Sequence, residues 1–397
     1  MHILFLPSWY PDSPEDVQGV FFRDQALALF NYGHDVGVIA PKLRSLKTLF
    51  KRAKPSAPFY EVDEGIPTYR KSLLAVLPRV PFGNYLLFRR AARFLLQCYI
   101  EEHGKPDVLH AHCAIFGGAI AVDLGREHGI PVVLTEHSSG FARNLFPGWQ
   151  LNLARRGFAG ACLLIAVSPA LGTLLGERFS FSENQWHWVP NVVSNRFSDH
   201  KRFGEKKSGT VFLNLALMTG NKGHSDLVEA FQQVVRSFPN AELWLAGDGP
   251  SRAALEKQVC DLGISGNVHF LGIIQPEKVP VLLERADVMV ISSHYETFGV
   301  VAAEALMAGM PVIATRCGGP ECIVESGDGL LVPVKHPEAL ADAMREVSET
   351  IDTFDSDSIA TRARLRFSGT AVARQLTDKY SQAINSFQGK TQGASAL

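Results

Sequence analysis

The chain has 397 residues, of which 46% are hydrophobic and 20% are charged, with a formal net charge of -1. This composition is that of a soluble globular protein with two or three domains, two being the simplest count. It excludes a strong overall attraction to nucleic acid, and no apolar stretch reaches the roughly 18 residues that a membrane span needs. The six cysteines lack zinc-ligand spacing, so we expect reduced thiols, no metal site and a cytoplasmic location.

Short apolar strands alternate with helical patterns through the first half of the chain. Buried strands are predicted at 3–6, 36–40, 108–111, 131–135 and 162–167, and helices at 21–31 and 115–124. This alternation predicts a parallel sheet covered by helices on both faces.

The same order resumes after a polar segment, 199–210, which we predict to be a linker. Strands are predicted at 211–216, 242–246, 268–271, 288–292, 312–314 and 330–332, with helices at 224–237, 252–262, 276–285 and 300–308. We therefore expect two doubly wound α/β domains, residues 1–200 and 208–369. An amphipathic segment, 370–388, is expected to join the first of them.

Ligands of open parallel sheets bind beyond the carboxyl ends of the strands. After the strand at 288–292, a loop carries Glu296, and a helix with Thr297 as N-cap is expected to begin near Phe298. The first-turn amides of such a helix can bind phosphate. Glu304 lies eight positions after Glu296 among small apolar residues. It is either an ordinary helical glutamate or, as we favour, a buried carboxylate that needs a partner.

These residues carry a resemblance to a known family. Glu296 and Glu304 form a Glu-x7-Glu pair in a Ser-x-x-Glu-Thr-Phe-Gly context, which is similar to that of family 4 glycosyltransferases. The resemblance extends over nearly the whole chain and includes Gly247–Pro250, Phe270–Gly272, Ala308–Ala314 and Gly318–Glu321. It implies the GT-B fold, with two facing Rossmann-like domains and a C-terminal helix that crosses back to the first.

The resemblance also implies that the first domain would bind the acceptor and the second domain the nucleotide-sugar donor, and it assigns roles to residues of the second domain. Glu304 would hold the ribose hydroxyls and Glu296 would face the donor hexose. The other positions assigned to donor binding by resemblance are the amides of Phe298, Gly299 and Val300, together with Gly272.

Lys222 follows the first strand of the second domain and resembles the lysine of the family's lysine-glycine motif. It would meet the donor diphosphate; the alternative is a solvated turn lysine. The family usually has an arginine five positions earlier, where this chain has Leu217. Arg196 or Arg316 could supply the second positive charge.

In the first domain, the resemblance places His112 near the donor hexose, as a hydrogen-bond donor or a proton carrier. His110 is expected to be structural. Glu136 lies in a segment that resembles another part of the family site, without a definite role. Gly19 would belong to a loop that admits the acceptor near the donor phosphates, or would only give flexibility at a helix start.

The expected reaction is transfer of a hexose from a nucleotide-diphosphate sugar with retention of anomeric configuration, without a metal or other cofactor. The acceptor would be a lipid-linked or polysaccharide intermediate of bacterial cell-surface glycan synthesis. The alternative is a non-catalytic GT-B subunit that binds a partner glycosyltransferase.

Two basic stretches, 42–54 and 70–93, are either solvated surfaces or a contact with anionic membrane at its inner face. The second is interleaved with aromatic residues, as in interfacial helices: Phe82, Tyr85, Phe88 and Phe94.

Overall fold

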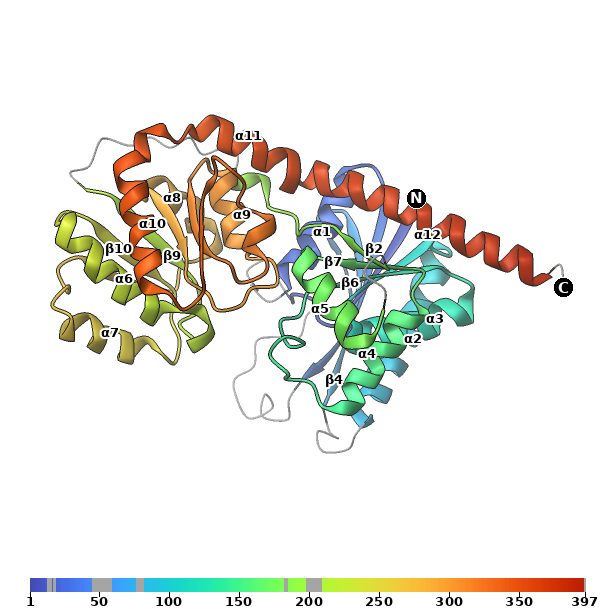
Figure 1. Ribbon diagram of the computed structural model, residues 1–397. Coiled ribbons are helices and arrows are strands. Elements are labelled where there is room, and N and C mark those ends of the chain that lie inside the picture. Colours follow the sequence, from blue (N-terminus) through green and yellow to red (C-terminus); the bar gives the residue numbers. More distant parts are fainter. Residues whose placement is uncertain are drawn as a thin grey trace. The chain divides into compact units, whose positions relative to one another are not determined.

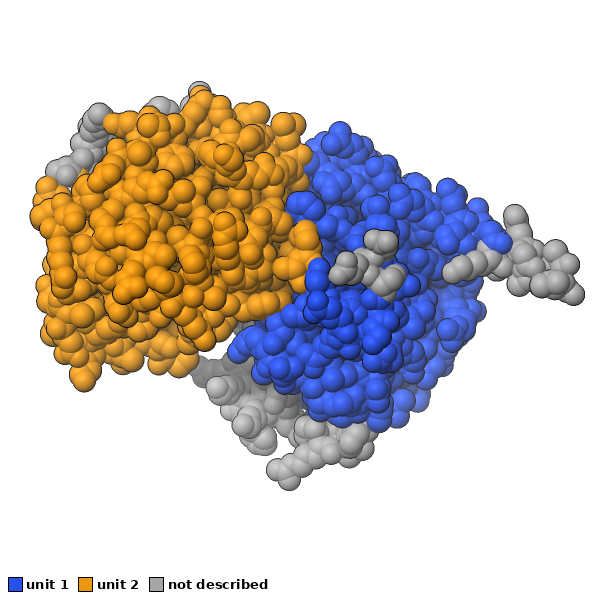
Figure 2. Space-filling model, in the orientation of Figure 1, with its two compact units in different colours: residues 1–167, 171–192, 369–397 blue, residues 168–170, 193–368 orange. Residues whose placement is uncertain are grey.

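The computed structural model describes residues 1–12, 16, 19–44, 59–75, 82–181, 185–197 and 209–395. The chain forms two compact units, coloured blue and orange in Figure 2. Unit 1 comprises Met1–Val167, Leu171–Val192 and Gly369–Leu397, and unit 2 comprises Ser168–Ala170 and Val193–Ser368. The predicted linker at 199–210 lies outside the described residues except for its last two positions.

Unit 1 is built on one sheet whose described strands lie in the order β3-β4-β2-β1-β5-β6-β7-β8. All neighbouring strands are parallel except the pair of β3 and β4 at the edge. The strands are β1 (His2–Pro7), β2 (Asp35–Arg44), β3 (Tyr60–Asp63), β4 (Ile66–Leu74), β5 (Val108–His112), β6 (Val132–Glu136), β7 (Leu163–Ala166) and β8 (Trp186–Trp188). The predicted parallel sheet is confirmed, and β1, β5 and β6 are buried because helices cover both faces.

The helices of unit 1 pack in two groups. Helix α1 contacts α12, whereas α2, α3 and α4 contact one another in sequence (Figure 1). Their bounds, with that of α5, are α1 (Val20–Asn31), α2 (Gly83–His103), α3 (Ala119–His128), α4 (Gly148–Gly160), α5 (Pro169–Phe179) and α12 (Gly369–Ser395). The helix predicted at 115–124 is wrong in its first part: a kinked segment, η2 (Ala114–Gly118), precedes α3 because Ile115 and Phe116 have non-helical backbone angles.

The final helix, α12, completes the core of unit 1. This confirms the prediction that the C-terminal segment joins the first domain. Tyr380 is fully buried, and its hydroxyl lies 2.7 Å from Nδ1 of His110. Val372 and Leu376 are also fully buried, in the same cluster as Phe22 of α1. Helix α12 is therefore part of the core and not an appended tail.

Unit 2 contains an entirely parallel sheet in the order β11-β10-β9-β12-β13-β14 within the described ranges. The strands are β9 (Val211–Leu215), β10 (Glu242–Ala246), β11 (Val268–Gly272), β12 (Val288–Ile291), β13 (Val312–Thr315) and β14 (Gly329–Val332). The helices are α6 (His224–Ser237), α7 (Arg252–Asp261), α8 (Val279–Arg285), α9 (Val300–Met307), α10 (Pro337–Thr350) and α11 (Ser356–Phe367). Helix α6 contacts α7 and α10, and α9 contacts α11, so this sheet too carries two helical groups.

None of the described helices combines the length and apolarity that crossing a bilayer requires.

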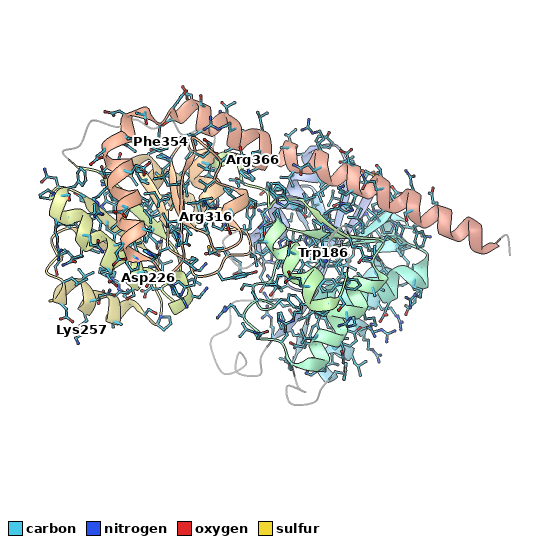
Figure 3. The ribbon with its side chains drawn as sticks, in the orientation of Figure 1. Trp186, Asp226, Lys257, Arg316, Phe354 and Arg366 are labelled. Atoms are coloured by element: carbon cyan, nitrogen blue, oxygen red, sulfur yellow. The ribbon has the colours of Figure 1, made fainter. Side chains whose placement is uncertain are left out.

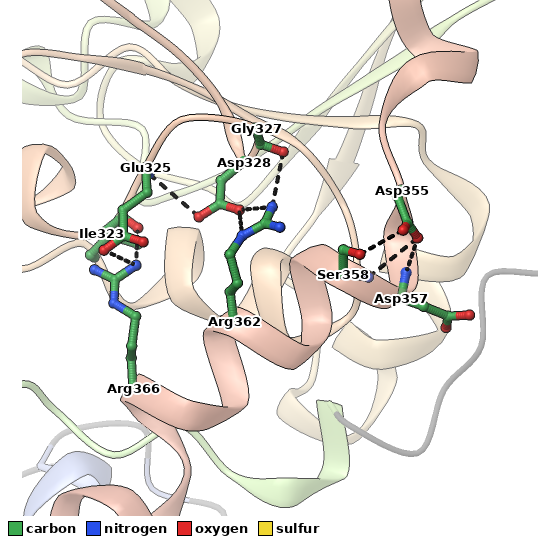
Figure 4. A network of polar contacts seen from close by, with 9 residues as sticks. All are labelled: Ile323, Glu325, Gly327, Asp328, Asp355, Asp357, Ser358, Arg362 and Arg366. Atoms are coloured by element: carbon green, nitrogen blue, oxygen red, sulfur yellow. Dashed lines mark hydrogen bonds and ion pairs between the residues drawn. The ribbon is translucent and has the colours of Figure 1, made fainter.

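Two arginines of α11 fasten the segment between β13 and β14 (Figure 4). Arg362 pairs with Asp328, whose side chain is only 1% exposed, and Arg366 Nη1 pairs with Glu325 at 3.1 Å. Arg366 also donates to the carbonyl oxygens of Cys322 and Ile323. A buried carboxylate of this kind requires a charged partner, so α11 is held to the sheet by charge as well as by packing.

We predict that Arg362→Ala destabilises the protein by about 2 kcal/mol, because Asp328 would remain buried without its cation. Breaking a buried pair costs roughly 3–5 kcal/mol, and the smaller figure reflects the 37% exposure of the Arg362 side chain. Urea unfolding measures the change. The matched control is Arg345→Ala, which removes an exposed pair with Asp342 on α10; a loss for Arg362→Ala no larger than for Arg345→Ala would contradict the prediction.

Candidate functional site

The strand order of unit 2 reverses between β9 and β12, which are neighbours in the sheet. Such a reversal is where ligands bind in open parallel sheets, beyond the carboxyl ends of the strands. Lys222 lies in the connection that follows β9, and Glu296 lies in the connection that follows β12. The two residues that were assigned to the donor by resemblance therefore occupy the two sides of one reversal point.

The structure brings Lys222 and Glu296 into direct contact. Lys222 Nζ lies 2.5 Å from Glu296 Oε1, and the Ser293 hydroxyl donates to the same oxygen at 2.7 Å. Their side chains are 23% and 16% exposed, so both remain accessible from solvent. The pair places the Lys222 cation beside the Glu296 oxygen acceptor. Such a pair can bind a phosphate through the cation and a hydroxyl of a neighbouring ring through the acceptor.

The loop that carries Lys222 is shaped by close backbone approach. Gly223 has φ +64°, and a Cβ there would lie 1.9 Å from the Ser292 carbonyl oxygen. Ser292 Oγ donates to the Lys222 carbonyl at 2.9 Å, and the His294 amide donates to Asn221 at 2.8 Å. Only glycine allows this approach, and it fixes the Lys222 backbone against the β12 connection.

The glycine-rich turn after β10 supports the same loop from the other side. Cβ atoms at Gly247 and Gly249 would lie 2.0 and 2.5 Å from the carbonyl oxygens of Ala216 and Met218. The Gly247 amide donates to the carbonyl of Gly272, which has φ +70° at the end of β11. In the structure Gly272 thus forms a backbone corner; the role in donor binding stays a prediction.

Helix α9 begins at residue 300, as predicted from the apolar pattern, and not near Phe298, as the predicted N-cap required. Its N-cap is Gly299, with φ +88°, and not Thr297, so the first helical residue is Val300. The Phe298 ring is 2% exposed and packs edge-on against Phe367 of α11 at 5.9 Å. This packing anchors the helix start, and the amides around Phe298, Gly299 and Val300 lie on the same connection as Glu296.

Glu304 is partly exposed, so its predicted burial is wrong. Helix α9 turns its small and apolar residues toward the core, namely Ala302, Ala303, Ala305, Leu306 and Met307. Glu304 falls between them on a half-exposed face.

The position of the missing family arginine, Leu217, is 67% exposed. Of the two substitutes considered, Arg316 is exposed directly after β13 (Figure 3). Arg196 is partly buried, and its guanidinium lies over the Phe197 ring at 4.9 Å.

In unit 1, His112, which is predicted to lie near the donor hexose, is the last residue of β5. It belongs to a cluster of three buried histidines, with His110 and His137. His112 is fully buried, with Nδ1 3.1 Å from Nε2 of His137 and with no hydrogen-bond partner for its own Nε2 among the described residues. Desolvation by burial, with His110 and His137 close by, holds the pKa of His112 well below its usual value. It is therefore a neutral imidazole, able to donate one hydrogen bond but not poised to carry a proton at neutral pH.

His110 is tied on both ring nitrogens, 2.8 Å from Thr135 Oγ1 and 2.7 Å from the Tyr380 hydroxyl. These contacts fit the structural role expected for it. Gly19 is the N-cap of α1 with φ +83°, a conformation that L side chains rarely adopt.

No group of three or more histidine, cysteine, aspartate or glutamate side chains in the described part of the chain is arranged to hold a metal ion. Metal-independent transfer stays a prediction.

Two family models match this chain and together extend from residue 18 to residue 357. The model described as glycosyltransferase family 4 matches residues 18–196, and the one described as glycosyl transferases group 1 matches residues 195–357. The chain therefore belongs to the family 4 glycosyltransferases and is an enzyme that transfers glycosyl groups.

Individual relatives agree with this assignment. The chain is 29% identical over 362 residues to the putative teichuronic acid biosynthesis glycosyltransferase TuaC of Bacillus subtilis, covering 87% of this chain and 88% of that one. It is 32% identical over 189 residues to the lipopolysaccharide core biosynthesis glycosyltransferase LpsE of Rhizobium meliloti, covering 47% and 53%.

Solved structures confirm the GT-B fold. The sucrose-phosphate synthase of Thermosynechococcus elongatus matches with a TM-score of 0.77 at 22% identity, over 96% of this chain and 99% of that one. HepE of Anabaena, solved in complex with UDP, matches with a TM-score of 0.72 at 20% identity, over 96% and 100%.

Proposed function

We propose that this enzyme transfers a hexose from a nucleotide-diphosphate sugar, with retention of configuration, to a lipid-linked or polysaccharide intermediate of cell-surface glycan synthesis. The observation that carries the proposal is the contact of Lys222 with Glu296 at the strand-order reversal of unit 2, next to the start of α9. Names of relatives that act in teichuronic acid and lipopolysaccharide synthesis support the choice of pathway class.

In the proposed reaction, the acceptor hydroxyl oxygen attacks the anomeric carbon on the face that the leaving group occupies. The bond from that carbon to the phosphate oxygen breaks, and the nucleoside diphosphate departs. The hydroxyl proton passes to a leaving phosphate oxygen, so no other reactant is needed.

Lys222 and the amides at the start of α9 stabilise the charge that develops on the diphosphate. Glu296 accepts a hydrogen bond from the hexose, and Glu304 accepts from the ribose. His112, as a neutral imidazole, donates from Nε2 to a sugar oxygen.

We further propose a peripheral contact with anionic membrane through part of the second basic stretch. Phe82, the N-cap of α2, is 42% exposed, and Leu86 and Phe94 on α2 are 56% and 44% exposed. Lys71 Nζ lies 3.7 Å from the centre of the Phe94 ring. Tyr85 and Phe88 belong to the core instead, and Arg89 and Arg93 pair with acids of α3. Most of the stretch 42–54 and Arg79 lie outside the described residues. Sedimentation with phosphatidylglycerol vesicles, compared with phosphatidylcholine vesicles, tests this contact.

We expect one class of nucleotide diphosphate, uridine, guanosine or adenosine, to raise the melting temperature in a concentration-dependent way. The matching nucleotide sugar should then yield a product whose anomeric proton coupling, measured by NMR, equals that of the donor. Inversion of that coupling would overturn the retaining mechanism. A folded sample that no nucleotide stabilises would favour the alternative, a non-catalytic subunit, for which the exposed Leu217 in place of an arginine is the supporting observation.

A further inference from the structure

Unit 1 contains a cavity of about 250 Å³ at the carboxyl ends of three neighbouring strands. Ser8 and Trp9 follow β1, Cys113 and Phe116 follow β5, and Ser138 follows β6. The strand order of unit 1 reverses between β1 and β5, so this cavity occupies the ligand position of its own sheet. Its volume lies below the roughly 300–1,000 Å³ of sites for drug-sized molecules, so it fits one small ring and not an extended chain.

The backbone on the β5 side of the cavity is held in conformations that its residues rarely adopt. Cys113 has φ +64°, and Phe116 has φ +70° with ψ -76°, the rare form of a three-residue turn. The Ser8 hydroxyl accepts from the Gly117 amide at 3.0 Å and lies 2.6 Å from the Ile115 carbonyl oxygen. Backbone strain of this kind collects at binding sites, where the surrounding structure enforces it.

Glu136 ties the two loops that form the walls of the cavity. Its carboxylate is fully buried and accepts the amides of Ala114, His137 and Ser138 at 2.8, 2.9 and 2.8 Å. A carboxylate offers about four acceptor positions, and backbone amides of the two loops occupy three of them, so Glu136 is a positioning residue for these loops.

Aromatic side chains dominate the walls, and Gln150 and Ser138 add polar groups. The aromatic residues are Trp9, Phe116, Phe141 and Phe146. Gly19 leaves room for the Trp9 ring, since a Cβ at Gly19 would lie only 3.0 Å from Trp9 Cδ1. An apolar chain would offer no hydrogen bond to the partly exposed amide of Gln150, whereas a sugar ring has a C–H face for the aromatic rings and hydroxyls for the amide and the serine.

We infer that this cavity binds a single sugar ring of the acceptor, with Trp9 and Gln150 as its specificity-determining contacts. The inference rests on the proposed function and adds to it the class of acceptor group that unit 1 recognises. It also assigns a role to Gly19, whose lack of a side chain leaves room for the Trp9 ring.

Saturation-transfer NMR tests the inference with the full-length enzyme and a panel of methyl glycosides of glucose, galactose, mannose and N-acetylglucosamine, recorded with the stabilising nucleotide diphosphate present. At least one glycoside should receive saturation, most strongly at its ring C–H protons. Trp9→Leu and Gln150→Met should each lower that signal at least fivefold. The matched control is Trp188→Leu, which removes a tryptophan of similar exposure on β8, 40% against 38%, and should leave the signal unchanged.

The nucleotide-induced rise in melting temperature separates the two possible failures. If the nucleotide stabilises every variant but no glycoside receives saturation, or if Trp9→Leu leaves the signal intact, the sugar subsite is wrong and the proposed function stands. Farnesyl phosphate serves as a lipid probe in the same experiment. If it receives saturation that Trp9→Leu removes, while no glycoside does, the cavity binds lipid, the sugar subsite is wrong and the proposed function stands. If neither nucleotide nor glycoside binds the folded enzyme, both are wrong.

Discussion

Lowering the pH from 7 to 5 is expected to destabilise unit 1 strongly. His110, His112 and His137 are buried, and desolvation lowers the pKa of each, to about 3 for His110 and His137. In the unfolded chain each imidazole titrates near 6.5, so below that pH the unfolded state binds more protons. The stability that neutral histidines contribute is complete above pH 6.5 and is lost as the pH falls toward 3.

The loss is roughly 1.4 kcal/mol per pH unit for each histidine, and up to about 4 kcal/mol per pH unit for all three. The raised pKa of buried Glu136 acts in the opposite sense, because the folded state then takes up a proton before the unfolded state does; it offsets part of the loss. With a usual domain stability of roughly 5–15 kcal/mol, unit 1 should be close to unfolding near pH 5.

Tryptophan fluorescence during urea unfolding reports this change, since four of the five tryptophans belong to unit 1. His137→Gln should flatten the dependence of the midpoint on pH, whereas His336→Gln, at an exposed position of unit 2, should not. A midpoint that stays constant between pH 7 and 5 would show that the three imidazoles do not remain neutral in the folded state.

Lys222→Met and Glu296→Gln should both abolish most transfer but differ in nucleotide binding. Removal of one charge-stabilising group from an active site costs roughly a factor of 10² to 10³ in kcat, and we expect that range for Lys222→Met. It should also weaken binding of the free nucleoside diphosphate, because the phosphates lose their cation. Glu296→Gln removes the carboxylate that holds Lys222 at 2.5 Å, so the diphosphate should bind as well as before or more tightly while hexose transfer falls.

Initial rates and calorimetric titration with the nucleoside diphosphate measure the two effects separately. Lys257→Met is the control, since Lys257 is 80% exposed on α7 of the same unit (Figure 3). Equal loss of nucleotide affinity in the Lys222 and Glu296 variants would contradict the division of roles between phosphate and hexose.

Much of this fold could be predicted from the sequence because buried parallel strands have a plain pattern. Apolar runs predict β1, β9 and β12, and the glycines of Gly247–Pro250 predict a turn where the chain approaches another backbone closely. Helix α2 was not predicted, because its arginines suggest a basic surface and its buried face mixes aromatic residues with small and aliphatic ones.

The site was predicted less completely, for reasons of long-range geometry. Lys222 and Glu296 each carry a recognisable motif, but their contact across 74 positions depends on the order of strands in the sheet. The positive φ angles of Cys113 and Phe116 have no signal in the residue types, since glycine is the usual marker of such angles. The role of Glu136 depends on those angles and could not be predicted without them.

The burial of Tyr380 in unit 1 has a consequence for the order of events at the ribosome. Residues 193–368 form nearly all of unit 2, so unit 2 can fold as soon as these residues have left the ribosome. Unit 1 must wait from Val192 until Tyr380 arrives, on the order of 10–40 seconds at roughly 5–20 residues per second. During that interval the face of the unit 1 sheet that carries α1 lacks Val372, Leu376 and Tyr380. The apolar side chains that these residues later cover are therefore exposed in the nascent chain, where chaperones or other copies of the chain can bind them.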